Sequence, residues 1–413
     1  MNRSNYFAAL AICLFALPSW AGEFPESSRL SLPEAIRLGL ANNPELASYR
    51  HQIAVLEAGK RIAARLPNPT AEAAFDEIGG KSDSRASFWL KQSLLVNGQR
   101  DAEISNASHR EEGAVQEALS KERTIRYRIK NSFYKVLMAQ QRARLFEESL
   151  ELAREVQRVA KLRYQAQASS EMDLLRSDVE VEASRIQAET GRKNIQLAQF
   201  ELLKEIGNEA MNGSCPLLVP FEPVAPASLD SLLSRLPAEN PSLRAAAANR
   251  RAAEAEWNQA KAGKFSNPEV GLGVIRRLEL GDNLLSASIG YPLPFFARNR
   301  EESERGEALF EKSKAEEASL KNELSLSLRQ GYAEYQSFLK NAGLYREKMI
   351  PTSEEAFKRM NLSYRYGRIP YLDLLESRRR LIEAKSSLLD ARERLAEAAF
   401  RIDSLFNDME TQR

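Results

Sequence analysis

The sequence predicts a mostly α-helical protein with a membrane β-barrel, built from two tandem structural repeats. Motifs in the first half return in the second half at offsets of 197 to 200 residues. Each half contains long stretches with apolar residues three and four apart, which is the helical period. Each half also contains two short segments of alternating apolar and polar residues, which predict four strands per chain.

The first residues of the chain have the pattern of a signal peptide. Arg3 gives a positive start, an apolar run follows from Ala8 to Leu17, and small residues end at Ala21. We expect residues 1–21 to be removed and the mature protein to leave the cytoplasm. Cys215 would then stand alone, so we expect no internal disulfide.

The overall charge of the chain excludes nucleic acid as a partner. The 413 residues include 59 Lys and Arg against 57 Asp and Glu, so no excess positive charge is available to bind nucleic acid. Charged residues make up 28% of the chain, which is typical of long helices in water. No mature stretch of about 18 apolar residues occurs, so we expect no membrane-spanning helix.

The repeated motifs divide the chain into tandem units. We expect a first repeat at 22–206, a connector at 207–228, a second repeat at 229–407 and a short tail at 408–413. Each repeat contains, in order, a helix, a β-hairpin, a long helix and a final helix. The first helix of the first copy is expected from Ser31 towards Ala64.

The long helices are expected at residues 98–165 and 299–366, and at ~1.5 Å per residue each would be a rod of ~100 Å. Tight reversals follow, with Gly367 as a helix stop before Pro370, and Ser170 as a cap before Asp173. The final helices carry apolar residues seven apart, with a small residue three positions after each of the first four. These stripes are Leu174, Val181, Ala188, Ile195 and Leu202, and Leu374, Leu381, Leu388, Leu395 and Ile402.

The four predicted strands need partners from other chains. Each is about ten residues long with one apolar side, which suits a tilted strand crossing a bilayer. An open sheet edge in lipid leaves backbone groups unpaired, and a barrel of useful width needs at least about eight strands. Three chains of four strands, forming a twelve-stranded barrel, are the smallest ring that leaves an open lumen.

Several of these motifs resemble a known family. Three motifs are similar to those of the TolC family of outer-membrane efflux proteins. They are Asn-Pro-Glu-Leu at 43–46, Pro-Asn-Pro at 67–69, and Tyr364 followed by Gly367 and by Asp-Leu-Leu at 373–375. Asn-Gly-Gln-Arg at 97–100 and residues 292–300 further resemble its CzcC-like branch, associated with export of cobalt, zinc and cadmium.

The resemblance implies a homotrimer in the outer membrane, with an α-helical tunnel extending into the periplasm. It also implies two protein partners, a periplasmic adaptor and an inner-membrane resistance-nodulation-division (RND) pump. The channel itself would be passive and would need no cofactor. Divalent heavy-metal cations are the expected cargo, and organic drugs or dyes are the alternative.

The resemblance also locates a gate at the tips of the helices. Acidic rings narrow this mouth in the family, and the matching residues here are Asp373 and Glu376. Asp373 would equally stabilise the start of its helix through the helix dipole. Tyr364 matches a latch tyrosine, whereas the latch arginine is replaced by Ile369, with Arg368 beside it. The candidate gating residues are Asp373, Glu376, Tyr364, Arg368 and Asp173.

Other kinds of site are not indicated. His51 and His109 have no Cys or His at ligand spacing, so we expect no tight metal site, and no group of residues indicates an enzyme. Arg378, Arg379 and Arg380 are expected to form a solvated face near Glu376 and Glu383. The main rival from another class is a periplasmic coiled-coil adaptor or scaffold, which would not need lipid-facing strands.

Overall fold

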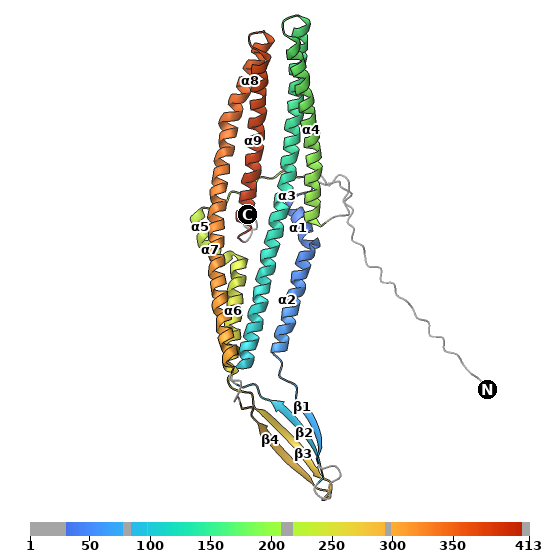
Figure 1. Cartoon of the computed structure of the whole chain (residues 1–413), viewed down its shortest axis with the longest axis vertical. Coiled ribbons are helices and arrows are strands. Elements are labelled where there is room, and N and C mark those ends of the chain that lie inside the picture. Colours follow the sequence, from blue (N-terminus) through green and yellow to red (C-terminus); the bar gives the residue numbers. More distant parts are fainter. Residues whose placement is uncertain (1–29, 77–83, 97, 208–217, 294–298, 407–413) are drawn as a thin grey trace, which may run out of the picture.

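The computed structural model describes residues 30–76, 84–96, 98–207, 218–293 and 299–406. Several predicted features lie outside these residues: the expected signal peptide, Cys215, most of the connector, the tail at 408–413, and parts of the motifs at 97–100 and 292–300. The described chain is an elongated rod of helices with a β-sheet at one end (Figure 1).

The elements occur in the same order in both halves, with a helical pair, two strands and a long helical hairpin. The first half contains α1 (Leu32–Asn42), α2 (Pro44–Ala63), β1 (Thr70–Asp76), β2 (Arg85–Ser93), α3 (Gln99–Gln165) and α4 (Glu171–Ile206). The second half contains α5 (Leu229–Glu239), α6 (Pro241–Ala262), β3 (Glu269–Arg277), β4 (Asn283–Gly290), α7 (Arg300–Leu344), η1 (Tyr345–Met349), α8 (Ile350–Arg365) and α9 (Tyr371–Asp403). The mostly helical fold with four strands is therefore confirmed.

Two predicted helices are interrupted. The helix expected from Ser31 to Ala64 is split into α1 and α2 at Asn43, because proline at position 44 disfavours helical backbone in the residue before it. The Asn43 side chain then caps α2 by accepting from the backbone N–H of Glu45 at 2.8 Å. The long helix expected at 299–366 is α7, the π-helical turn η1 and α8.

The sheet is antiparallel, in the order β1-β2-β3-β4. Its register places one set of apolar side chains on a single face, and these are all exposed. They are Phe75, Phe88, Leu90, Leu272, Val274, Leu285 and Ile289. The opposite face is mostly polar, and Glu72 pairs there with Lys91. The Trp89 ring on this face lies against Gly273, where an added Cβ would come within 2.5 Å of the ring.

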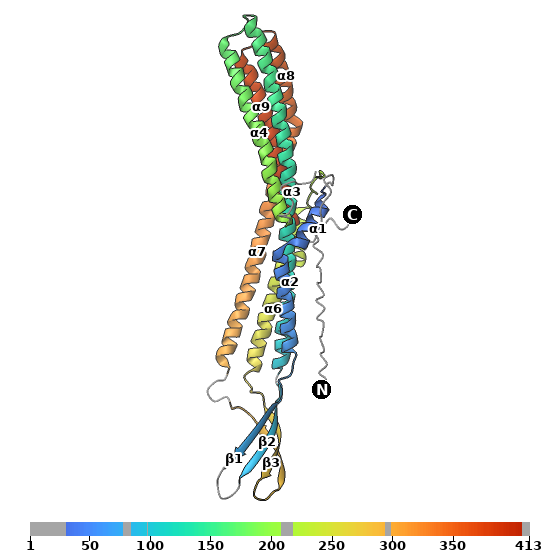
Figure 2. The same cartoon turned by 90° about the vertical axis from the view of Figure 1, so that its right-hand side faces the viewer.

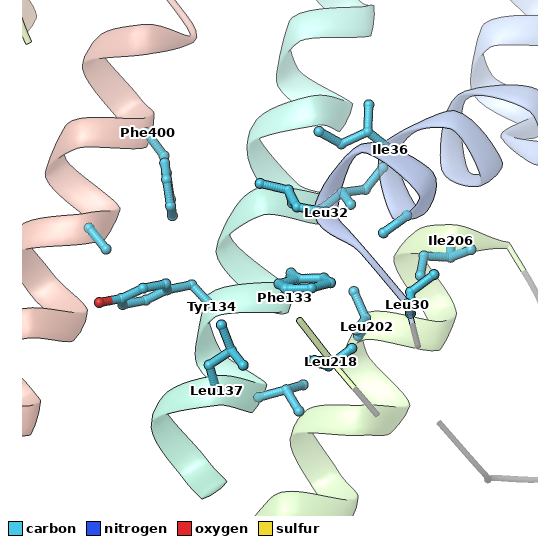
Figure 3. Packing of buried hydrophobic residues seen from close by; sticks show 14 of the residues in the cluster. Leu30, Leu32, Ile36, Phe133, Tyr134, Leu137, Leu202, Ile206, Leu218 and Phe400 are labelled. Carbon is cyan, nitrogen blue, oxygen red and sulfur yellow. The ribbon is translucent and has the colours of Figure 1, made fainter. Parts of the chain in front are cut away.

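The two halves meet in a core midway along the rod. Phe133 and Tyr134 of α3 pack there with Phe400 of α9, while Leu30 and Leu218 form a β-bridge beside them (Figure 3). This core joins the end of each half to the middle of α3. In the part of the chain that the structure describes, no helix is both long enough and apolar enough to span a lipid bilayer.

Three of the four small residues of the α4 seam are buried. Ser177, Ser184 and Gly191 are buried, and a Cβ on Gly191 would lie only 3.1 Å from the backbone of Ala143 in α3. The close approach of α3 and α4 therefore depends on the missing side chain.

We predict that Gly191→Leu destabilises the hairpin by about 1–3 kcal/mol, because the larger side chain must push α3 and α4 apart. The matched control is Gly59→Ala in α2, where the added Cβ meets nothing within 4 Å. That change should stabilise the protein by about 0.5–1 kcal/mol. Unfolding followed by circular dichroism compares them, and equal stability of the two variants would contradict the packing argument.

Candidate functional site at the helical tips

Two tight turns lie together at the end of the rod farthest from the sheet (Figures 1 and 2). One joins α3 to α4, and the other joins α8 to α9. Their geometry matches, because Gln167 and Gly367 both adopt a left-handed backbone, with φ of 58° and 74°. In each turn the backbone N–H of the next residue donates to the carbonyl five residues earlier. Ala168 donates to Arg163 at 2.8 Å, and Arg368 donates to Ser363 at 2.9 Å. The predicted stop at Gly367 is confirmed, and Pro370 precedes α9 as its N-cap.

Arg163 joins the two turns. Its guanidinium donates to the carbonyl of Tyr364 at 2.6 Å and to the carbonyl of Ala168 at 2.9 Å. It also lies over the Tyr364 ring, 4.5 Å from the centroid, in a cation–π contact. One side chain from the end of α3 therefore binds its own turn and the end of α8.

Tyr364 is in the interior of the tip rather than on its surface. It is 1% exposed and contacts the edge of Tyr371 with ring centroids 5.8 Å apart. Burial raises the pKa of Tyr364, and the nearby Asp173 adds to this shift against the opposing charge of Arg163. Burial, reinforced by Glu180, raises the pKa of Tyr371 to about 12. Both tyrosines are therefore neutral packing residues at neutral pH.

The other predicted gating residues lie on the surface of the tip. Asp173 is half-buried near Tyr364, and its backbone N–H donates to the Ser170 hydroxyl at 3.2 Å. Asp373 is exposed in the first turn of α9, and Arg368 is exposed with its guanidinium 5.7 Å from the Tyr366 ring centroid. Glu376 accepts from Arg380 at 2.6 Å. Among the described residues of this single chain, Asp373 forms no ion pair.

The expectation that Arg378 belongs to a solvated face is wrong. Arg378 is 4% exposed and donates to the Ser149 carbonyl of α3 at 3.1 Å and to the Ser184 hydroxyl of α4 at 3.3 Å. Arg378 also forms an ion pair with Glu180 of α4. Arg379 forms a second ion pair with the same Glu180, at 2.8 Å. Arg380 does lie on the surface and pairs with Glu376.

Glu180 remains charged in this partly buried place. Burial would raise the pKa of its carboxyl, but the hydrogen bonds and charges of Arg379 and Arg378 outweigh burial and hold the pKa below its ordinary value. The α3–α4 and α8–α9 hairpins are thus joined by two basic contacts, one through Arg163 at the turns and one through Arg378 further along the helices.

Arg163 and Glu180 were not predicted from the sequence. Comparison of the repeats does not find Arg163, because Ser363 stands at the matching position. The sequence does indicate that Arg378 lies near a helix interface. It stands four residues after Leu374 and next to the small seam residue Ser377, and such a position borders the interface.

The described residues contain no group of three or more His, Cys, Asp or Glu placed to hold a metal ion. The tip therefore presents packed tyrosines, arginine contacts between hairpins and an acidic surface. These contacts join the α3–α4 hairpin to the α8–α9 hairpin.

Comparison with known proteins shows which family the second half of the chain matches. The model for outer membrane efflux proteins matches residues 232–408, which run from within α5 to beyond α9. Residues 232–408 belong to the outer membrane efflux protein family. The family resemblance drawn from the sequence motifs is confirmed.

A curated relative extends the similarity to most of the chain. The cobalt-zinc-cadmium resistance protein CzcC of Cupriavidus metallidurans is 27% identical over 389 residues, which cover 91% of this chain and 90% of CzcC. The predicted similarity to the CzcC-like branch of the efflux proteins agrees with this match.

Solved structures share the fold. Crystal structures of CusC match with a TM-score of 0.77 and 15% identity, covering 93% of each chain. The outer-membrane channel OprN matches with a TM-score of 0.76 and 17% identity, over 91% of this chain and 89% of its own. The open state of the Neisseria gonorrhoeae MtrE outer membrane channel matches at 0.73 and 17%, over 91% and 88%.

We predict that Arg378→Met destabilises the protein by about 3 kcal/mol, because removal of one partner from a buried ion pair leaves the other charge uncompensated. Arg379 still reaches Glu180, so the loss should lie near the low end of the usual range. Arg380→Met is the matched control and should cost about 1 kcal/mol or less, since that side chain is 73% exposed. Similar unfolding midpoints for the two variants would contradict the role of Arg378.

Proposed function

We propose that this protein is the outer-membrane channel of a tripartite efflux system. Three copies form one twelve-stranded barrel in the outer membrane and one helical tunnel in the periplasm, through which exported cargo moves passively. The adaptor protein and the RND pump are the proposed partners, and the pump supplies the energy. The sheet is the observation that carries this proposal.

The sheet has the surface of an incomplete barrel. Its apolar face is exposed, with Leu285 at 84% and Ile289 at 79%, and no helix of the chain covers it in either view (Figures 1 and 2). Among the described residues β1 pairs only with β2, and β4 only with β3. Lipid suits the apolar face, and edges shared with sister subunits satisfy the unpaired backbone groups.

The α4 helix supports association of several copies. Besides the buried seam, it carries a second stripe of apolar residues, spaced by multiples of seven and exposed in the single chain. These residues are Met172, Val179, Ile186 and Phe200. At two matching positions of α9 stand Arg379 and Ser386, so the stripe is interrupted in the second copy. A heptad stripe of this kind packs against another helix, and a neighbouring subunit provides one.

The length of the rod suits a periplasmic tunnel. The 67 residues of α3 extend for ~100 Å at ~1.5 Å per residue, more than three times the hydrocarbon thickness of a bilayer. With the sheet in the outer membrane, the tips would lie deep in the periplasm, where an adaptor could reach them. The scaffold alternative leaves the exposed apolar strands without a purpose.

Divalent heavy-metal cations are the proposed cargo. The similarity to a cobalt-zinc-cadmium resistance protein supports this choice, as do the exposed carboxylates of Asp373 and Glu376 at the tip. Threefold symmetry would gather six such groups around one axis, and rings of acids favour cations over anions. Organic drugs or dyes are the second candidate, and sensitivity of a deletion strain to zinc, cobalt and cadmium salts rather than to dyes separates the two.

The oligomer is tested with the full-length protein extracted from the outer membrane in detergent. We expect native mass spectrometry to give three chains per particle, and planar bilayers to show ion conductance. Val274→Arg, placed on the apolar face, should prevent assembly because a cation at the bilayer centre costs about 2–4 kcal/mol. Ser288→Arg on the polar face is the control. Recovery of a monomer from the soluble periplasm would exclude the channel.

Replacement of both Asp373 and Glu376 by Ala should raise the conductance of the trimer and weaken its preference for cations, because six negative charges leave the constriction. Reversal potentials in a salt gradient measure the preference. The control is Glu355→Ala, which removes an exposed acid of α8 further from the turn. Conductance and selectivity equal to those of the unmodified trimer would place the constriction elsewhere.

A further inference from the structure

The mostly polar face of the sheet contains two glycines that lie beneath side chains of other strands. Gly271 and Gly273 of β3 are both buried, although no described helix covers the sheet in either view (Figures 1 and 2). The residues that alternate with them, Leu272 and Val274, lie on the opposite, apolar face and are exposed. The cover over the two glycines therefore comes from the sheet itself.

The ring of Trp89 covers Gly273. Trp89 of β2 stands directly opposite Gly273 in the antiparallel register. A Cβ on Gly273 would lie 2.5 Å from Cδ2 and 2.6 Å from Cε3 of the indole, so the ring lies against the backbone of β3. A glycine inside a strand often marks such a close approach, and aromatic side chains cover glycines of adjacent strands in this way. A side chain at residue 273 would therefore lift the ring from the sheet.

Lys91 is also held along the sheet. It stands opposite Gly271, where an added Cβ would lie 3.2 Å from Cγ of Lys91 and 2.5 Å from Oγ of Ser288. The ammonium group of Lys91 forms an ion pair with Glu72 of β1. The stem of Lys91 is therefore next to β3 while its charge is bound to a residue of β1, so both ends have partners on neighbouring strands.

The two copies of the hairpin are complementary on this face. The first hairpin provides the large side chains Glu72, Trp89 and Lys91. At an offset of 199 residues, the matching residues of the second hairpin are all small, namely Gly271, Ser288 and Gly290. Large side chains of the first copy therefore lie over small residues of the second copy.

The open width of a β-barrel depends on such inward side chains. About eight strands enclose an interior that side chains fill, whereas about 16 to 18 strands leave an aqueous channel. The proposed barrel of twelve strands lies between these cases, so the length and direction of its inward side chains decide how much of the interior stays open. In the proposed trimer the mostly polar face lines the lumen, and three Trp89 rings lie at one level.

We propose that two glycines of β3 determine the open width of the barrel lumen. Gly273 allows the Trp89 ring to lie against the wall, and Gly271 allows the same for the stem of the neighbouring lysine. If these side chains stood upright, three indole rings and three lysine stems would project into the lumen and narrow the path of the cargo. The Trp89–Gly273 pair is thus a determinant of the size of cargo that passes the barrel, separate from the residues at the helical tips. This inference rests on the proposed function, because only a closed barrel has a lumen.

The position of the ring is tested by fluorescence of the full-length protein extracted in detergent. Trp20→Phe and Trp257→Phe leave Trp89 as the single tryptophan of the chain. Gly273→Val should then displace the ring into water, which shifts its emission to longer wavelength and increases its quenching by acrylamide. Gly290→Val is the matched control on the same face, because a Cβ there meets nothing closer than 4.0 Å.

The width of the lumen is tested by single-channel conductance in planar bilayers. These measurements use the Asp373→Ala and Glu376→Ala background, so that the constriction proposed at the tips does not mask a change in the barrel. Gly273→Val should lower the conductance more than Gly290→Val, which adds the same side chain to the wall without displacing a ring. Combining Gly273→Val with Trp89→Ala should remove this difference, since the displaced ring is then gone.

Either of two results would overturn the inference. One is emission and quenching of Trp89 that are equal in Gly273→Val and Gly290→Val, and the other is a displaced ring without the extra loss of conductance. Should Gly273→Val fail to assemble, Gly273→Ala places a Cβ at the same point and should cause the same changes to a smaller extent, and their absence would contradict the inference. Lack of conductance in every variant and in the unmodified protein would exclude the channel, and with it the lumen. Normal conductance that is equal in Gly273→Val and Gly290→Val would exclude the role of Gly273 alone.

Discussion

The sheet imposes the main constraint on this molecule. Four strands with an exposed apolar face and two open edges cannot be stable in lipid as a single chain, because each unpaired backbone group costs several kcal/mol there. Sharing edges with identical neighbours removes this cost. In lipid, association with other chains is therefore required by the backbone of β1 and β4 before any side chain of the helices is considered.

The helices must then serve two purposes. Each has to pack within its own chain, which the seams of small residues in α4 and α9 achieve, and each has to leave surface for its neighbours. In α4 the second purpose is visible as the exposed stripe that includes Val179 and Ile186. In α9 the matching positions carry Arg379 and Ser386, since that helix faces other elements of its own chain. The two copies have kept one fold while their outer surfaces diverged.

Local rules explain what could be predicted from the sequence. Alternation predicted the strands, the heptad spacing predicted the seams, and the left-handed residue Gly367 marked a turn, because each depends on neighbours in sequence. The buried Arg378 and the bridging Arg163 could not be found in this way. Their partners, Glu180 and Tyr364, lie about 200 residues away, and only the packing of one hairpin against the other brings them together.

The asymmetry between the copies follows from the same packing. A carbonyl left without its N–H is costly when it is buried, so a proline is tolerated only where the helix is exposed. At Ser149 the helix α3 is enclosed, and the Ser149 carbonyl accepts a hydrogen bond from Arg378 of the neighbouring hairpin. At Met349 the rod is open to solvent, and Pro351 with its π turn is accommodated. The two rods are related by the repeat, and of the two matching positions only the one in the exposed rod is a proline.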